Sequence, residues 1–327
     1  MTDHDQEHGH QHGWRGVLIG LFHPHSHDSA DSVDSALEDS ANGVQAVKIS
    51  LVALLVTAMA QLAVVVVSGS VALLADTVHN FSDALTAVPL WIAFVLARRV
   101  PTRQYTYGYG RAEDLAGLFI VAMIALSAVV AGYEAIRRII NPVAIDNLGW
   151  VATAGVVGFI GNELVARYRI VVGHKIGSAA LVADGLHART DGFTSLAVVL
   201  GAGGVALGWP LADPIVGLAI TAAILAVLRT AARDVWRRLM DGVDPETVHA
   251  AEHLLTNLHG VQGIDEVRMR WLGHALYAEV SLTVDEGLTL SEGHQIAHQA
   301  ERELIRVISK LRTATVHAYP AHADIHS

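Results

Sequence analysis

Residues 180–191 read Ala-Leu-Val-Ala-Asp-Gly-Leu-His-Ala-Arg-Thr-Asp, and residues 72–83 read Ala-Leu-Leu-Ala-Asp-Thr-Val-His-Asn-Phe-Ser-Asp. The two segments carry Asp, His and Asp in the same register and at one constant offset. Within each copy the three residues are spaced i, i+3 and i+7, so that they share one face of an α-helix. The chain therefore contains an internal repeat with two similarly arranged polar faces.

Each copy lies within a long apolar run, and the chain contains six such runs. They occupy residues 49–68, 70–97, 113–136, 148–167, 178–204 and 211–230. About 20 apolar residues suffice for a helix to cross the hydrocarbon core of a bilayer. The composition agrees, because 52% of the residues are hydrophobic and only 17% are charged, which is unusual for a soluble domain. We predict a membrane all-α bundle of six transmembrane helices over residues 46–239; a large soluble helical protein fits six such runs poorly.

Lysine and arginine residues gather at alternate ends of the predicted spans. One side holds Lys48, Arg98, Arg99, Arg103, Arg111, Arg167, Arg169, Lys175, Arg229, Arg233, Arg237 and Arg238. The other holds only Arg137 and Arg138. By the positive-inside rule, both termini are expected in the cytosol, in a multi-pass protein of the cell (inner) membrane. The second span then runs inward and the fifth outward, which makes the two repeat copies antiparallel.

The repeat brings two His and two Asp to the middle of the membrane: His79 and Asp83, His187 and Asp191. Ionisable groups at this depth are costly unless they are paired or solvated, and they are functional candidates for that reason. Together they supply two nitrogen and two oxygen ligands, a set suited to tetrahedral zinc. The alternative is two His–Asp pairs that serve packing alone. The sequence thus predicts a metal site, with zinc as the first choice.

Other metals fit the four residues less well or remain open. The chain has no Cys, and Cu(I) prefers thiolate or thioether ligands. Mg²⁺ and Ca²⁺ take six or more oxygen ligands. Cd²⁺, Co²⁺, Fe²⁺ and Mn²⁺ stay possible beside zinc.

Further charged residues flank the four candidate ligands. Asp76 and Asp184 lie one turn earlier in each copy; they are expected to orient the imidazoles as outer-shell partners or to carry protons separately. Arg189 lies about 200° around the helix from His187, so it should point away from the metal. Glu163 in the fourth span is a candidate partner for it.

Both ends of the chain differ from the predicted bundle. Residues 1–45 are acidic and rich in His, and we expect a disordered cytosolic segment that acts as a weak metal buffer or has no function. From residue 240 the pattern predicts a helix at 247–258, strands at 264–271 and 276–284, a helix at 291–310 and a strand at 313–319. This α-β-β-α-β order suits a small ferredoxin-like α+β domain over 240–320, followed by a His-containing tail at 321–327. The acidic ends favour cations over nucleic acid as partners.

Taken together, His79-x-x-x-Asp83, His187-x-x-x-Asp191, the six spans and the C-terminal α-β-β-α-β pattern resemble the cation diffusion facilitator family. Residues 107–113 and the pair Asp213-Pro214 agree with it. The resemblance implies a homodimeric antiporter that exports Zn²⁺, or a close relative of it, in exchange for protons. It also implies that the four His and Asp residues form the transport site.

Two departures from the family pattern matter. The loop after the second span carries Thr102, Tyr105 and Tyr109 where some relatives place His and Asp, so we predict no metal there. In the C-terminal domain, the positions that bind metal in relatives match Asp265, Ser281, His294, His317 and Tyr319. Asp265, His294 and His317 are the candidates for a regulatory zinc ion, with His298 or His322, Asp324 and His326 as helpers. The alternative is a set of surface histidines without a ligand.

Two other functions use the same residues. A membrane-embedded zinc hydrolase would need an open coordination position and a nearby base. The repeat supplies two equivalent halves instead, and no His-Glu-x-x-His motif is present, so we predict a transporter and not an enzyme. A metal sensor without transport is the third possibility.

Overall fold

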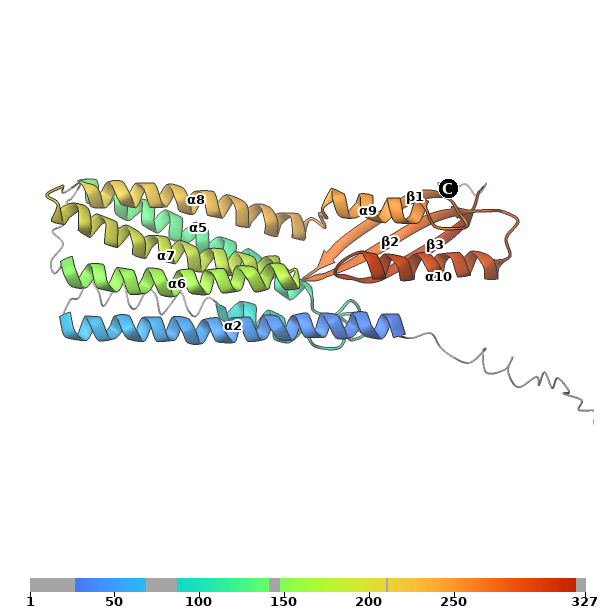
Figure 1. Ribbon diagram of the computed structural model, residues 1–327, viewed down its shortest axis with the longest axis horizontal. Coiled ribbons are helices and arrows are strands. Elements are labelled where there is room, and N and C mark those ends of the chain that lie inside the picture. Colours follow the sequence, from blue (N-terminus) through green and yellow to red (C-terminus); the bar gives the residue numbers. More distant parts are fainter. Residues whose placement is uncertain (1–26, 69–86, 141–147, 210, 322–327) are drawn as a thin grey trace, which may run out of the picture.

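The computed structural model describes residues 27–68, 87–140, 148–209 and 211–321. Five long helices run side by side as a bundle (Figure 1). They are α2 (His27–Ser68), α5 (Arg111–Ile140), α6 (Leu148–Ile176), α7 (Ala179–Ala206) and α8 (Ala212–Leu239). A shorter helix, α4 (Ala87–Ala97), packs against α2 and α5. The C-terminal domain lies at one end of this bundle, which we call the near end; the opposite end is the distal end.

Four of the described helices are long and apolar enough to cross a membrane. These segments are Glu38–Val64, Arg111–Ile140, Gly149–Ile176 and Ala212–Leu239, and they confirm the first, third, fourth and sixth predicted spans. The fifth predicted span coincides with the helix α7, which is 28 residues long but is not among these four segments. The second predicted span falls largely on residues 69–86, outside the described residues; its end is α4.

Several helices extend beyond the predicted apolar runs. Helix α2 begins at His27, so the prediction that all of residues 1–45 are disordered was wrong for its second half. Helix α6 continues to Ile176 and α8 to Leu239. An apolar run marks only the part inside the membrane, whereas each added residue gains a backbone hydrogen bond until a breaker follows. For α6 that breaker is Gly177, whose φ of 76° is easily adopted only by glycine.

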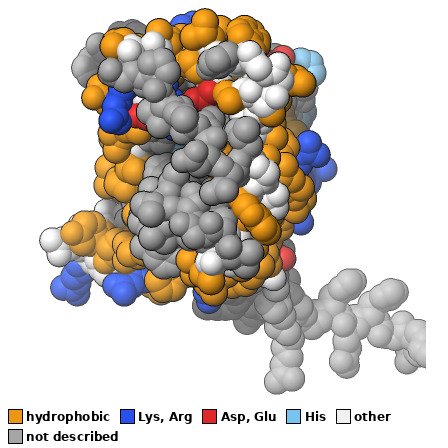
Figure 2. All heavy atoms as spheres, turned by 90° about the vertical axis from the view of Figure 1, so that its left-hand side faces the viewer, with side chains coloured by type: hydrophobic (Ala, Val, Ile, Leu, Met, Phe, Trp, Pro, Cys, Tyr) orange, Lys and Arg blue, Asp and Glu red, His pale blue; other side chains and the backbone are white. Residues whose placement is uncertain are grey.

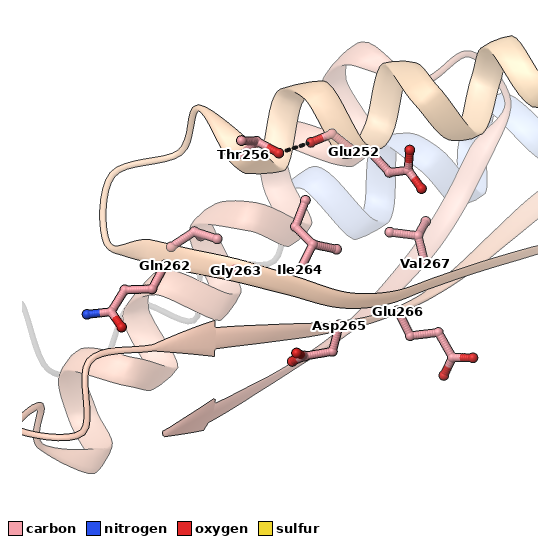
Figure 3. Close-up of a pocket in the computed structure, with 9 residues that line it drawn as sticks. Glu252, Thr256, Gln262, Gly263, Ile264, Asp265, Glu266 and Val267 are labelled. Carbon is pink, nitrogen blue, oxygen red and sulfur yellow. Dashed lines mark hydrogen bonds between the residues drawn. The ribbon is translucent and has the colours of Figure 1, made fainter. Parts of the chain in front are cut away.

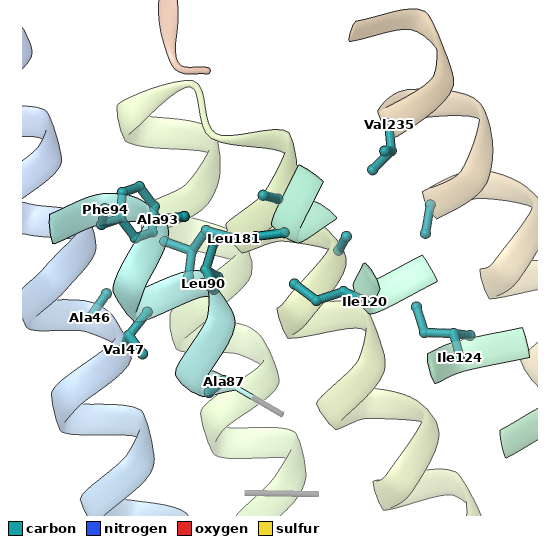
Figure 4. Packing of buried hydrophobic residues seen from close by; sticks show 14 of the residues in the cluster. Ala46, Val47, Ala87, Leu90, Ala93, Phe94, Ile120, Ile124, Leu181 and Val235 are labelled. Carbon is teal, nitrogen blue, oxygen red and sulfur yellow. The ribbon is translucent and has the colours of Figure 1, made fainter. Parts of the chain in front are cut away.

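The helices at the near end of the bundle share one hydrophobic core (Figure 4). Leu90 and Phe94 of α4 lie at its centre and are completely buried. The residues packed with them include Ala46 and Val47 of α2, Ile120 and Ile124 of α5, Leu181 of α7 and Val235 of α8. A Cβ atom at Gly43 would lie 2.7 Å from the Phe94 ring, so this glycine lets α2 approach α4. Large apolar side chains also cover the outside of the bundle, as expected of surfaces that face lipid (Figure 2).

Glycine residues set the close contact between α6 and α7. A Cβ atom at Gly185 would lie 2.7 Å from the Ile170 Cγ1 atom and 3.0 Å from the Ala166 backbone oxygen. Small residues at helix contacts let two backbones approach closely inside a membrane. Since Gly185 lies between Asp184 and His187, this contact holds the polar face of α7 against α6.

We expect Gly185→Ala to lower the thermal stability of the purified protein. An extra methyl group here must displace the α6 backbone, and overpacking of this kind costs about 1–3 kcal/mol. Gly203→Ala on the same helix is the matched control, because no atom lies within 4 Å of its added Cβ. That change should be neutral or stabilising, by up to about 1 kcal/mol, because alanine favours helices. Equal melting temperatures for the two variants would contradict the contact.

The C-terminal domain has the predicted α-β-β-α-β order. Its elements are α9 (Pro245–Thr256), β1 (Val261–Leu272), β2 (Ala275–Val284), α10 (Leu290–Val307) and β3 (Leu311–Pro320). The sheet order is β1-β2-β3, with β1 antiparallel and β3 parallel to the central β2. Leu255, Leu276, Leu282 and Leu304 are fully buried in its core.

The turn between β1 and β2 fixes this domain to the near end of the bundle. His274 is buried there, with Nδ1 2.8 Å from a Glu113 carboxylate oxygen on α5 and Nε2 3.2 Å from the Ser40 hydroxyl on α2. Arg238 of α8 donates hydrogen bonds to the backbone oxygens of Gly273 (3.0 Å) and Gly177 (2.9 Å). A single turn thus contacts three helices, and a displacement of the domain is expected to displace their ends.

Candidate metal centre

His187 and Asp191 lie one turn apart on α7, and both are buried. The His187 Nδ1 atom is 3.8 Å from the Asp191 Oδ1 atom. Asp191 is about 18 Å along the helix from its start at Ala179, given a rise of 1.5 Å per residue. The pair therefore lies near the middle of a helix of 28 residues, at the depth predicted from the repeat.

The other half of the predicted site is not described. His79, Asp83 and Asp76 all fall within residues 69–86, outside the described residues. Over the described ranges, no three His, Asp or Glu side chains are grouped closely enough to hold a metal ion. The structure thus places two of the four predicted ligands together, and the four-ligand set stays a prediction.

Asp184 has a partner that the sequence analysis did not name. Its carboxylate lies 3.0 Å from the Nη1 atom of Arg169 on α6, and both side chains are almost completely buried. The sequence analysis placed Arg169 beyond the end of the fourth span and so did not consider it, and the outer-shell or proton-carrying role of Asp184 stays a prediction. Since α6 continues to Ile176, Arg169 lies inside the helix and faces α7. A buried arginine beside a buried aspartate forms a neutral pair next to the proposed metal ligands.

Arg189 has the partner that the sequence suggested. Its Nε atom donates to Glu163 Oε2 and its Nη2 atom to Glu163 Oε1 on α6, each at 3.2 Å. Arg167 also donates to Glu163, at 2.8 Å. This two-pronged ion pair joins α6 and α7 on the side away from His187, so we assign Arg189 to the helix contact.

Uncharged polar residues that the sequence analysis missed lie between α2, α6 and α7. A Cβ atom at Gly158 would lie 2.7 Å from the Gln61 Nε2 atom and 2.8 Å from the Ser195 hydroxyl oxygen. Asn162, one turn further along α6, is buried against Gly192 of α7. Single polar residues inside apolar runs were the only signal for them. They make the interior of the bundle polar beside Asp191.

The loop that lacks the family's second metal motif lies at the near end. The Tyr105 backbone N–H donates to the Thr102 hydroxyl at 3.1 Å. The rings of Tyr105 and Tyr109 are 4.9 Å apart. These contacts are local to an exposed loop.

Within the described part of one chain, the candidate ligands of the predicted regulatory site are not grouped closely enough to hold a metal ion. Asp265 lies on β1 and accepts two hydrogen bonds from the Thr283 hydroxyl, at 2.8 and 3.0 Å. Figure 3 shows Ile264 and Val267 pointing toward α9, while Asp265 points away from it. His317 is on β3, across the central strand. His294 is on α10, with its ring 4.3 Å from that of His298. His322, Asp324 and His326 lie outside the described residues.

Comparisons with known proteins agree with this architecture. The family model for the cation efflux transmembrane domain matches residues 47–240, and that for the cation efflux protein cytoplasmic domain matches residues 243–321. The probable cation efflux system protein Rv2025c of Mycobacterium tuberculosis is 65% identical over 96% of this chain and 95% of its own length. The manganese efflux system protein MneP of Bacillus subtilis is 25% identical over 83% and 94%.

A solved C-terminal domain of MamM is 20% identical, with a TM-score of 0.23, over 23% of this chain and 94% of that chain. The family models cover most of the chain in the order in which the bundle and the C-terminal domain occur. This protein is therefore a multi-pass membrane transporter, not an enzyme, and belongs to the cation diffusion facilitator family of cation efflux proteins.

Proposed function

We propose that this protein exports Zn²⁺ in exchange for protons through a site formed by His79, Asp83, His187 and Asp191. The buried His187–Asp191 pair in the middle of α7 is the observation that carries the proposal. The same pair recurs in the sequence at His79 and Asp83. A histidine and a carboxylate buried in a membrane helix are costly, and binding a cation offsets that cost.

The ligand types favour zinc. Two imidazole nitrogens and two carboxylate oxygens complete a tetrahedral zinc site. Mn²⁺ is the competing cargo, because a relative is named for manganese efflux. Manganese prefers oxygen ligands, so the two histidines favour zinc.

The histidines also explain how protons would be coupled to the metal. An imidazole binds metal only when it is neutral, and an unperturbed histidine titrates near pH 6.5. Protons and Zn²⁺ therefore compete for the same nitrogen atoms. On one side of the membrane metal displaces protons, and on the other protons expel metal, as six spans tilt around the central site.

We further propose that two copies pair through their C-terminal domains, which are ferredoxin-like. The family model of the cation efflux cytoplasmic domain, which matches residues 243–321, is named for dimerisation. Asp265, His294 and His317, which one chain keeps apart, would then bind regulatory zinc only if the two copies contribute together.

Zinc flux and proton flux should be linked in proteoliposomes. We expect external Zn²⁺ to enter vesicles and release protons, reported by a pH-sensitive dye inside, and a reversed proton gradient to reverse zinc movement. Mn²⁺ should compete weakly with Zn²⁺. Replacing both His79 and His187 with Asp should shift the pH dependence of transport to lower pH, because carboxylates titrate near pH 4. Zinc entry without proton release would reject antiport.

Both termini are expected in the cytosol. The chain contains no Cys, so a single Cys placed at Ser35 or Ser327 is a clean label. Membrane-impermeant thiol reagents should modify either position only after the cells are opened. Labelling in intact cells would overturn this topology.

A further inference from the structure

A cavity of about 560 Å³ lies between α5, α7 and α8 in the distal half of the bundle. Each helix contributes a stripe of residues at helical spacing, such as Met123, Ser127 and Arg138 on α5. Met123 and Arg138 are about 22 Å apart along the helix, at 1.5 Å per residue. The cavity therefore extends from the middle of the membrane to its distal side.

The two ends of this cavity have different chemistry. Asp191 lines it at mid-membrane, with Thr194 one turn beyond on α7. Glu134, Arg138 and Asp213 line its distal end. The cavity thus connects Asp191, a proposed metal ligand, with the charged residues Glu134, Arg138 and Asp213 at its distal end.

The three charged residues at the distal end form one ion-paired group. Arg138 Nη1 is 2.8 Å from the Asp213 carboxylate on α8, and Arg138 Nε is 3.1 Å from Glu134 on its own helix. Arg137 Nη1 also lies 3.4 Å from a Glu134 carboxylate oxygen, so two guanidiniums balance the two carboxylates. Because Arg138 donates to both carboxylates, neither is left to close around a metal ion.

We propose that this cavity is the path by which the metal ion leaves Asp191 for the distal side, and that Arg138 prevents Glu134 and Asp213 from retaining it. An exit must hold the ion weakly enough for it to leave. Glu134 and Asp213 without Arg138 would offer two carboxylates to a divalent ion. The inference rests on the transport role proposed above for Asp191.

Counting bound zinc tests the role of Arg138. Both proteins compared are full-length and carry Asp191→Ala. The one that also carries Arg138→Gln should bind about one more Zn²⁺ per chain than the one that keeps Arg138, because two carboxylates become free to ligate. Adding Asp213→Asn should remove that extra ion. With Asp191 intact, Arg138→Gln should slow zinc transport roughly tenfold or more, and Arg138→Lys, which keeps the charge, should restore it.

Arg137→Gln is the matched control. It removes the same charge one residue earlier, at an exposed side chain that pairs with Glu134 at 3.4 Å but does not line the cavity, and it leaves Arg138 bound to both carboxylates. It should neither add a zinc ion nor slow transport. Equal zinc binding and equal transport for Arg137→Gln and Arg138→Gln would overturn the proposal for Arg138, provided that the wild-type protein transports zinc.

Thiol labelling tests the path without relying on transport or on an Arg138 variant. Ser127→Cys lines the cavity, whereas Val129→Cys lies on the outer, exposed face of the same helix. A charged thiol reagent reacts with the thiolate, which forms in water and not in lipid. Added on the distal side, it should modify Ser127→Cys at least about tenfold faster than Val129→Cys. Equal or slower labelling at Ser127 would reject a water-filled path, whether or not the protein proves to carry zinc.

Discussion

Asp191→Ala is expected to abolish zinc transport while the protein stays folded in the membrane. Even the loss of a residue that only supports a metal ligand commonly costs about 10–100-fold in affinity. Removing a ligand itself should cost at least that much, and it leaves His187 without the carboxylate 3.8 Å away. We expect zinc flux into proteoliposomes to fall about 100-fold or more, and zinc binding by the purified protein to weaken with it.

Tyr105→Ala is the control for this result. Tyr105 lies in the loop at the near end, where its ring packs at a tilt against that of Tyr109, and its loss should change flux far less. The melting temperatures of the Asp191→Ala and Tyr105→Ala proteins should be similar. The loss of flux in Asp191→Ala is then not caused by unfolding. If the Asp191→Ala protein transports zinc at the wild-type rate, Asp191 on α7 is not part of the transport site.

Arg169→Met is expected to destabilise the bundle strongly. It leaves the Asp184 carboxylate charged and buried, because Arg169 is the one ion-pair partner of Asp184 among the described residues. Breaking a buried ion pair from one side typically costs about 3–5 kcal/mol. We expect a large fall in melting temperature and in the yield of monodisperse protein.

The double variant Arg169→Met/Asp184→Leu distinguishes a charge effect from a packing effect. Replacing both partners by apolar side chains is often neutral or stabilising, so the double variant should be more stable than Arg169→Met alone. Its zinc flux then reports whether the pair acts in transport or only in folding. The single variant Asp184→Leu completes the comparison. If the stability losses of Arg169→Met and Asp184→Leu add up to the loss measured in the double variant, the pair contributes no interaction of its own.

Local patterns in the sequence predicted much of the fold. Four spans were visible because lipid requires long apolar runs, and the C-terminal α-β-β-α-β order was visible because helices and strands have different hydrophobic periods. The same short-range geometry placed His187 and Asp191 on one face of α7 and turned Arg189 toward Glu163.

The contacts between distant segments were decided only by the tertiary structure. Asp184 pairs with Arg169, and His274 is buried against Glu113 at the near end. Arg138 bridges α5 and α8 to reach Asp213. Sequence periodicity says which face of a helix a residue occupies, but a partner on another helix depends on how far each helix extends and how closely the backbones pack. The spacing of His and Asp therefore determined that His187 and Asp191 share one face of α7, whereas the packing of α5, α6, α7 and α8 determined which charges surround them.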